Sequence, residues 1–458
     1  MSIVAAHRLH AQSALLPNGW AFDVVIEIDE SGTIASVASG VSDASAERCA
    51  GPVVPAMANV HSHAFQRALA GRTGRASPAH DDSFWTWREA MYAFLARVDA
   101  DVFAAIAAQT YVEMAKAGYA TVAEFHYVHH DPNGKAYADP AELSWRVVAA
   151  AEEAGLGLTL LPVFYAHAGF GCVAPRDDQR RFVHSVDSYR RLIATLTDAA
   201  AKRRFVLGVA PHSLRAITPD ELAAIVGLAG ADTPLHIHAA EQTKEVDECV
   251  AWSGLRPVEW LLKHANVDRR WCVVHATHMT DDETRALARS GAVAGLAPTT
   301  EADLGDGTFP ALAYVAENGA FGIGSDSNTI IDPFAELRQL EWSQRLRDHR
   351  RNVLASGDAS VGTSLWVRAA RGGAQAAGRK SGAIAPGHRA DLVVLNASDP
   401  ALTLQRSDEI LDAAMFGPSK DPVRDVMSGG IWIVRDGHHA RETEIFAGYR
   451  VALRSLET

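Results

Sequence analysis

The feature that most constrains this 458-residue chain is an alternation of short apolar runs with longer helical patterns, which begins at about residue 50. Repeated strand and helix units of this kind build parallel sheets. Eight strand-like runs can be counted, and eight units predict an α/β fold with a closed (β/α)8 barrel of the TIM type. The runs are Val53 to Val60, Ala120 to Phe125, Gly157 to Phe164, Phe205 to Ala210, Pro234 to Ala239, Trp271 to Val274, Ala292 to Leu296 and Phe321 to Gly324.

Two helix starts between these runs carry capping signals. Thr218, Pro219 and Glu221 combine an N-cap, a proline in the first turn and a capping-box glutamate. Thr280 and Glu283 repeat the box. We therefore expect helices to begin directly after Thr218 and after Thr280.

The two ends of the chain differ in character from the barrel. Both contain short strand-like runs with turn signals, such as Asn18-Gly19 near the start and Ala390 to Leu395 near the end. We predict that they pair into one small β-sandwich-like domain; the alternative is that each end is a ragged edge of the barrel. The predicted boundaries are residues 1–52 and 381–458 for the two parts of the small domain, and residues 53–380 for the barrel.

Composition excludes several classes of protein. The 43 Lys and Arg residues are outnumbered by 55 Asp and Glu, and the net charge of −12 argues against nucleic acid or an anionic membrane as partner. The 4 cysteines lack C-x-x-C spacing, which favours a reducing cytoplasm. The uncharged stretch between Glu153 and Arg176 is interrupted by glycines and Pro162, so it predicts a buried strand and a loop instead of a membrane span. The charged segment from Glu336 to Leu354 predicts a solvated helix.

Polar side chains recur at the carboxyl ends of the predicted strands, where barrel enzymes place their reacting groups. A histidine buried only for packing would not recur at the same end of successive strands. The residues at these ends are His61, His63, His126, Tyr127, His212, His238, Glu241, His275 and Asp326.

Four of these residues suggest a metal site. The spacing of His61 and His63 puts both imidazoles on one side of an extended chain, although such a pair alone can equally be a polar cross-strand feature. His238 and Asp326 would complete the nitrogen and oxygen shell that zinc accepts. Because a catalytic zinc lowers the pKa of bound water to about 7, hydrolysis is the predicted chemistry.

Other polar residues near these ends have two interpretations each. Glu241 could carry a proton to a leaving nitrogen, or it could be an ordinary glutamate in the first turn of the next helix. His275 could polarise the attacked centre, or it could simply pack at a strand end. Arg215 could bind a carboxylate in bidentate fashion, or it could form a surface ion pair. Asp326 could bind metal and also accept the proton of water.

The motifs PVVPAMANVHSHAFQ, HIHAAE, VVHATH, GIGSDS and GAIAPGHRADLVVL resemble those of the amidohydrolase superfamily, over nearly the whole chain. The resemblance is to the deaminase-like members. Many other members use two metals bridged by a carboxylated lysine on strand four, but no lysine occurs between Phe205 and His212. The resemblance therefore implies one Zn2+ per subunit.

Within that superfamily, the segments HSHAFQRA, FWTWRE, FHY, APHSLRA, HAAEQ and TTEADLGDGT resemble the formimidoylglutamate deiminase family. This implies hydrolysis of N-formimidoyl-L-glutamate to N-formyl-L-glutamate and ammonia in histidine degradation, by a cytoplasmic homo-oligomer, most simply a dimer. The implied roles are zinc binding by His61, His63, His238 and Asp326, catalysis by Glu241, His275 and Asp326, and substrate binding by Gln66, Arg88, Tyr127, His212 and Arg215.

Two alternative functions stay open. A deaminase of the same barrel that acts on guanine, another aminopurine, a pterin or a triazine would need aromatic stacking and amide-edge contacts instead of an arginine clamp. A metal-binding homologue without catalysis would be inert towards every amidine and aminopurine. The full ligand set together with Glu241 disfavours this second alternative.

Overall fold

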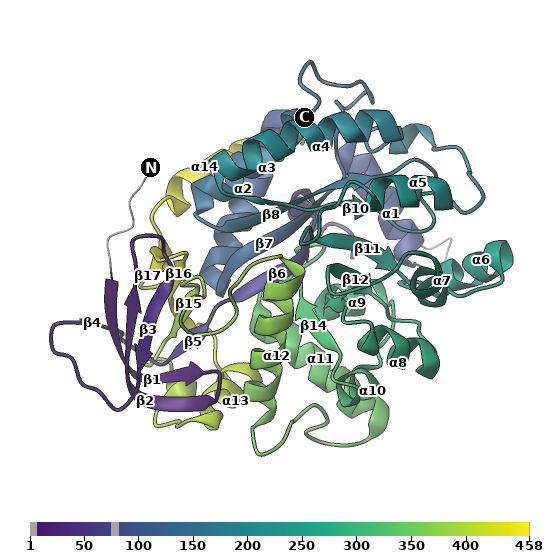
Figure 1. The fold of residues 1–458 in the computed structure, drawn as a ribbon. Helices are drawn as coiled ribbons and strands as arrows, with labels where there is room; N and C mark the ends of the chain where they lie inside the picture. Colours follow the sequence, from purple (N-terminus) through teal and green to yellow (C-terminus); the bar gives the residue numbers. More distant parts are fainter. Residues whose placement is uncertain (1–6, 75–81, 458) are drawn as a thin grey trace.

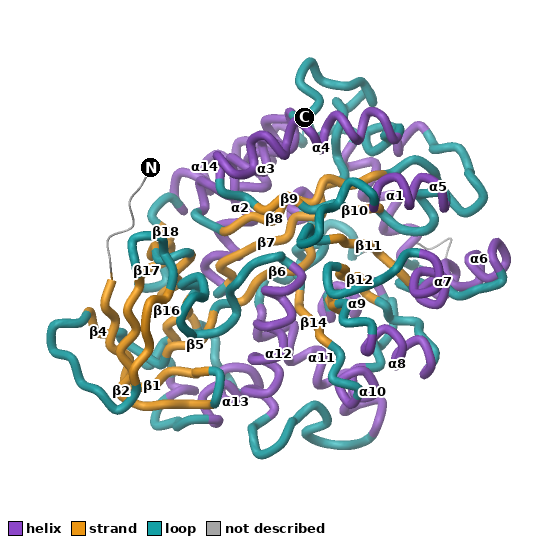
Figure 2. Tube along the Cα trace, in the orientation of Figure 1, coloured by secondary structure: helices purple, strands orange, loops and turns teal. Residues whose placement is uncertain are grey.

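The structure is a computed structural model that describes residues 7–74 and 82–457. Parallel strands form a central barrel, and helices surround it (Figure 2). The barrel strands are β6 (Met57–Ser62), β7 (Tyr119–His126), β8 (Gly157–Phe164), β9 (Val206–Leu207), β10 (Ala210–Pro211), β11 (Leu235–Ala239), β12 (Trp271–His275), β13 (Val293–Leu296) and β14 (Ala320–Ile323).

Hydrogen bonding divides the barrel strands into two sheets. One has the order β10-β8-β7-β6, with β9 beside β8, and the other has the order β11-β12-β13-β14. Backbone bridges join them at two seams, between Val209 and Leu235 and between Ser62 and Asp326. Because β9 and β10 both pair with β8 and together form the fourth strand, the barrel has eight strands, and the predicted (β/α)8 barrel is confirmed.

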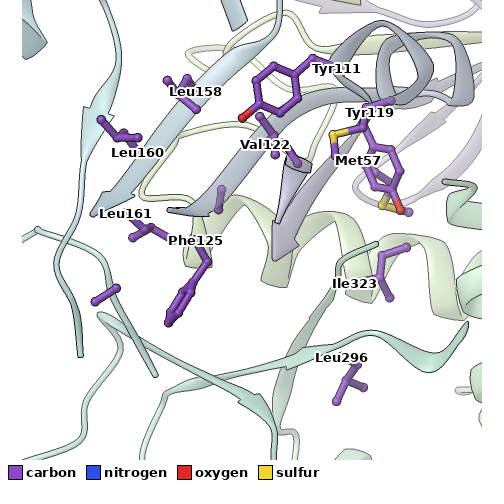
Figure 3. Close-up of a cluster of buried hydrophobic side chains, with 14 of the residues drawn as sticks. Met57, Tyr111, Tyr119, Val122, Phe125, Leu158, Leu160, Leu161, Leu296 and Ile323 are labelled. Atoms are coloured by element: carbon purple, nitrogen blue, oxygen red, sulfur yellow. The ribbon is translucent and has the colours of Figure 1, made fainter. Parts of the chain in front are cut away.

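The barrel core explains why its strands could be recognised in the sequence. Every residue of β7 and β8 is buried, because the strands face the barrel interior on one side and helices on the other. Phe125, Leu161, Leu296 and Ile323 are among the side chains of this core (Figure 3). Strands covered on both faces appear as continuous apolar runs, and this is the pattern that the sequence shows.

The helices lie between the strands, and both predicted starts are confirmed. The Thr218 and Thr280 hydroxyls each accept a hydrogen bond of 3.2 Å from the backbone N of the glutamate three residues later. The α-helices are α1 (Phe84–Leu95), α2 (Ala100–Ala117), α3 (Glu142–Ala154), α4 (Val186–Arg203), α5 (Pro219–Val226), α6 (Thr243–Ser253), α7 (Pro257–His264), α8 (Asp281–Arg289), α9 (Pro298–Leu304), α10 (Ala311–Ala316), α11 (Pro333–Asp348), α12 (Val361–Ala376), α13 (Asp408–Phe416) and α14 (Glu442–Ser455).

The two chain ends form a separate nine-stranded sheet beside the barrel, seen at the left of Figure 1. Strands from the start of the chain, in purple, lie next to strands from its end. The members are β1 (His7–Leu16), β2 (Gly19–Ile28), β3 (Ile34–Ala38), β4 (Glu47–Arg48), β5 (Val53–Pro55), β15 (Leu392–Leu395), β16 (Val423–Ser428), β17 (Ile431–Arg435) and β18 (His438–His439).

Two predicted strands were wrong in extent. The run from Val53 to Val60 is two strands, because β5 pairs with β1 and β15 in the terminal sheet, whereas β6 belongs to the barrel. The run from Phe205 to Ala210 is interrupted at Gly208, where a Cβ would lie 2.4 Å from Leu161 Cδ2. Both parts, β9 and β10, pair with β8, and between them Val209 N donates a hydrogen bond of 2.9 Å to the carbonyl of Pro234.

Two further segments bear on predictions from the sequence. The uncharged stretch after Glu153 contains the buried strand β8 and a loop, as expected. Across residues 7–74 and 82–457, the structure contains no helix with the length and apolar character that a membrane crossing requires. The charged helix predicted from Glu336 to Leu354 is α11, which starts three residues earlier and ends at Asp348, before His349 in the left-handed conformation.

Candidate metal centre and active site

Three histidines and one aspartate converge at the carboxyl end of the barrel. Nε2 of His61 lies 3.1 Å from Nε2 of His63 and 3.0 Å from Nε2 of His238. Oδ1 of Asp326 lies 3.6 Å from the His61 nitrogen and 3.4 Å from the His63 nitrogen. Tetrahedral zinc ligands at their usual bond lengths stand about 3.3 Å apart. These separations of 3.0 to 3.6 Å are close to that value, so the four groups are candidate ligands of one metal.

The protonation states of the histidine rings also suit the binding of a metal cation. Nδ1 of His63 lies 3.0 Å from the carbonyl of Phe125, and Nδ1 of His238 lies 3.0 Å from the carbonyl of His212. Each Nδ1–H donates to its carbonyl, so the lone pair of each ring stands on Nε2. Burial lowers the pKa of His63 to about 3 and the pKa of His238 well below its usual range. Neutral imidazoles with converging lone pairs, beside a carboxylate, form a donor set for a divalent metal.

The backbone at the β6–β14 seam holds two of these ligands in place. His63 N donates to the carbonyl of Asp326, and Asp326 N donates to the carbonyl of His61, both at 2.9 Å. The side-chain amide of Asn328 donates to the carbonyls of His63 and Asp326, each at 3.0 Å. Asp326 has a positive φ of 44°, a conformation that aspartate tolerates better than most residues. The sequence analysis did not identify Asn328.

Glu241 and His275 lie beside the metal ligands. Oε1 of Glu241 is 3.7 Å from Nε2 of His275, and this nitrogen is 3.8 Å from Oδ2 of Asp326. Glu241 precedes Gln242, the N-cap of α6, so it does not belong to the first helical turn. On the far side of the ring, Nδ1 of His275 lies 3.3 Å from Oε1 of Glu301.

These carboxylates determine the charge of His275. Burial alone would lower its pKa, but Glu241, Glu301 and Asp326 outweigh burial and raise the pKa to about 10. Burial raises the pKa of Asp326 to about 7, against the influence of His275. The site can thus hold a protonated imidazole next to a carboxylate that exchanges protons near neutral pH. The sequence analysis gave Glu301 no role, although it lies in the segment TTEADLGDGT.

The five predicted substrate-binding residues line one pocket, together with His63, His238, Glu241, His275 and Asp326. The Gln66 side-chain amide donates to the hydroxyl of Tyr127 at 2.9 Å. The Nε atoms of Arg88 and Arg215 are buried and have no hydrogen-bond partner within the part of the chain that the structure describes. Nη2 of Arg215 lies 3.6 Å from Oε2 of Glu241. The pocket therefore combines acidic groups near the metal ligands with guanidinium groups that lack full pairing. The five residues are Gln66, Arg88, Tyr127, His212 and Arg215.

The remaining pocket wall is largely aromatic, and the sequence analysis missed it. Tyr165 directly follows β8, so the rule of polar residues at strand ends could have found it. Tyr92 lies on α1, and the ring centroid of Tyr92 is 5.7 Å from the Arg88 guanidinium. No local sequence pattern reveals that α1 lies over the mouth of the barrel. The aromatic wall residues are Phe84, Trp87, Tyr92, Tyr165 and Phe182.

Comparisons with known proteins agree with this geometry. The family model described as "Amidohydrolase family" matches residues 53–433, and the chain belongs to the amidohydrolase family. Within that family it groups with formimidoylglutamate deiminases. The model described as "Formimidoylglutamate deiminase HutF, N-terminal domain" matches residues 6–51. The chain is also 51% identical to formimidoylglutamate deiminase from Pseudomonas aeruginosa, over 95% of this chain and 96% of that one.

Solved structures show the same fold. An amidohydrolase from Brucella melitensis is 48% identical, with a TM-score of 0.94 over 99% of this chain and 100% of that chain. An adenosine deaminase from Xanthomonas campestris with bound zinc is 21% identical, with a TM-score of 0.81 over 98% of each chain. At that identity the likeness shows the fold alone.

Proposed function

We propose that this protein hydrolyses N-formimidoyl-L-glutamate to N-formyl-L-glutamate and ammonia, a step of histidine degradation. One observation carries the proposal: the buried Arg215 and the partly buried Arg88 bring incompletely paired guanidinium groups into the pocket that contains the metal-ligand cluster. Guanidinium groups bind carboxylates in bidentate geometry, and this substrate carries two carboxylates. The 51% identity to formimidoylglutamate deiminase supports the same substrate.

We propose one Zn2+ per subunit, held by His61, His63, His238 and Asp326. The donor set of three neutral imidazoles and one carboxylate is the chemistry that zinc accepts. When bound, zinc would supply a Lewis acid that lowers the pKa of water towards neutrality.

The proposed proton transfers use carboxylates that each lie within 4 Å of His275. Asp326 accepts a proton of the attacking water, because it is a carboxylate beside the proposed metal and 3.8 Å from His275. The imidazolium of His275, oriented through Nδ1 by Glu301, stabilises the negative charge on the oxygen that adds to the formimidoyl carbon. Glu241, 3.7 Å from His275, carries one proton of the water to the imino nitrogen. The second water proton, accepted by Asp326, passes to the same nitrogen, so that ammonia leaves with both.

The pocket orients the substrate so that a particular bond breaks. Arg88 and Arg215 hold the two carboxylates, and Gln66, Tyr127 and His212 surround the formimidoyl end. Water adds to the formimidoyl carbon, and the protonated terminal nitrogen is then the better leaving group. The C–N bond to this nitrogen breaks, ammonia departs, and the carbon keeps the water oxygen as a formyl group.

One assay tests the proposal. The protein loaded with zinc is incubated with N-formimidoyl-L-glutamate, and ammonia, N-formyl-L-glutamate, formamide and glutamate are quantified. We expect ammonia and N-formyl-L-glutamate in equal amounts. Formamide with glutamate would contradict the assigned bond, and turnover of guanine or of another aminopurine, but not of this substrate, would contradict the assigned function.

We also propose a cytoplasmic homo-oligomer, most simply a dimer. The described cysteines are free thiols, which suits a reducing compartment. Phe446 and Val451 on α14 are 48% and 67% exposed and offer apolar surface for a second copy. Light scattering coupled to size exclusion tests this prediction, and a monomer at micromolar concentration would contradict it.

A further inference from the structure

The indole of Trp85, on α1, lies close to three cationic side chains. The guanidinium carbon of Arg88 is 4.6 Å from the ring centroid, and that of Arg215 is 5.9 Å from it. Nζ of Lys244, on α6, is 4.6 Å from the same centroid. An aromatic face attracts cations, most strongly for tryptophan. Trp85 therefore holds together positive charges that would otherwise repel one another.

The three cations differ in exposure. Arg215 is 8% exposed and lines the pocket, as does the partly buried Arg88. The side chain of Lys244 is 58% exposed, and neither it nor Trp85 lines the pocket. The acidic group nearest to Lys244 is Glu248, one helical turn away, at 3.8 Å. A solvent-accessible ammonium thus stands just outside the two pocket arginines.

This placement has an electrostatic consequence. The chain carries a net charge of −12, so a substrate with two carboxylates approaches against an unfavourable overall field. At moderate salt, ions screen charges that lie more than about 10 Å away, whereas a cation close to the substrate is screened less. A cation at the pocket entrance raises the local concentration of an anion and speeds its capture.

We propose that Lys244 and Trp85 form an outer subsite for the carboxylates of the substrate: Lys244 attracts these carboxylates, and Trp85 keeps Lys244, Arg88 and Arg215 within reach of one another. This inference rests on the proposed function for the identity of the dicarboxylate. Lys244 is a specificity-determining residue of the entrance, and Trp85 is a positioning residue.

The test compares K244Q with a matched control at low and at high salt. In K244Q we expect kcat/KM for N-formimidoyl-L-glutamate to fall about fivefold at low salt through a higher KM, with kcat unchanged. At high salt the difference shrinks to less than about twofold, because added ions screen the exposed ammonium. The control is K263Q on the neighbouring helix α7, which removes one exposed positive charge away from Trp85. Its kcat/KM should stay at the wild-type value.

Two further variants test Trp85. W85F keeps an aromatic face, and its KM should stay close to the wild-type value. W85L has no aromatic face, and its KM should be higher. Equal KM values for W85F and W85L would overturn the positioning role.

Calorimetric titration with N-formyl-L-glutamate separates this inference from the proposed function. The dissociation constant should rise in K244Q at low salt only. If wild-type protein binds this dianion through Lys244 but releases no ammonia from the substrate, the proposed function fails and the subsite stands. If wild-type protein is active and K244Q matches it at low salt, the subsite is overturned.

Discussion

Two groups of histidines lie at the same end of the barrel, and only the first brings its ring nitrogens together as a candidate metal site. In the first group, the Nε2 atoms of His61, His63 and His238 lie 3.0 and 3.1 Å apart, next to Asp326. In the second group the ring centroids are also close, with 4.4 Å between His129 and His184. The second group consists of His126 at the end of β7, His129 and His130 just after it, and His184 between β8 and α4.

The difference lies in where the ring nitrogens point. His129 and His130 use Nε2 for the carbonyls of Val163 and Val183, both at 2.9 Å, and keep Nδ1 without a partner in the described part of the chain. Among the described residues, the convergent donor sets all belong to the first group and its neighbours His275 and Asp326. His63 and His238 differ from His129 and His130, because backbone carbonyls occupy their Nδ1 atoms and leave the Nε2 atoms to converge beside Asp326.

The largest expected effect comes from breaking the first group. H63Q should lose its bound zinc, and activity should fall by more than about a thousandfold, because the site loses a ligand and its Lewis acid. H184Q, the matched change in the second group, should keep the zinc stoichiometry. Metal analysis and ammonia release measure both. Full zinc content and activity in H63Q would mean that the convergent geometry does not hold the metal.

Next in size is the loss of the proposed proton carrier. E241Q should retain zinc while its activity falls by about a hundredfold or more, because the amide cannot deliver a proton to the leaving nitrogen. The control E248Q changes an exposed carboxylate on α6 whose ion-pair partner, among the described residues, is Lys244, and it should keep wild-type activity at high salt. Unchanged activity in E241Q would remove Glu241 from the mechanism.

A smaller effect is expected from Glu301, which contacts the outer nitrogen of His275 at 3.3 Å. In E301Q the imidazolium loses a charged partner, and we expect activity to fall by about tenfold to a hundredfold. Zinc content and the thermal midpoint should change little. The pH profile separates positioning from packing: its alkaline limb should move to lower pH, because one carboxylate that raises the pKa of His275 is gone. A profile identical to that of the wild type would contradict this role.

The parts of the fold that the sequence predicted are those set by local signals. The capping boxes at Thr218 and Thr280 and the apolar barrel strands need no knowledge of distant partners. The division of the run from Val53 to Val60 could not be predicted, because both halves are apolar and buried although they join different sheets. The break at Gly208 likewise depends on Pro234, which is distant in sequence.

The same distinction applies to the candidate site. The histidines and Asp326 could be grouped in advance, because parallel strands bring their carboxyl ends to one edge. Glu301 could not be grouped with them in advance, since it reaches His275 from helix α9. The preceding strand, β13, ends in apolar residues. Trp85 and Tyr92 lie on α1, and only the packing of this helix over the pocket gives them a role.

The second group leads to the smallest predicted effect, a dependence of stability on pH. Burial lowers the pKa of His126 and of His184 to about 3, whereas an unfolded histidine titrates near 6.5. Below pH 6.5 these histidines bind protons in the unfolded chain but not in the folded chain. The free energy of unfolding therefore decreases as the pH falls towards 3. We expect each of these histidines to contribute about 2 kcal/mol of this loss by pH 5.

Urea unfolding at pH 7.5 and pH 5 measures this loss. The first group also titrates, so the informative quantity is the difference between proteins. H184Q should lose less stability than the wild type between the two pH values, because it has one fewer buried imidazole to protonate. H438Q, at a side chain that is 76% exposed, should lose as much as the wild type. An equal loss in H184Q would show that the second group admits protons while folded, and that burial does not keep its rings neutral.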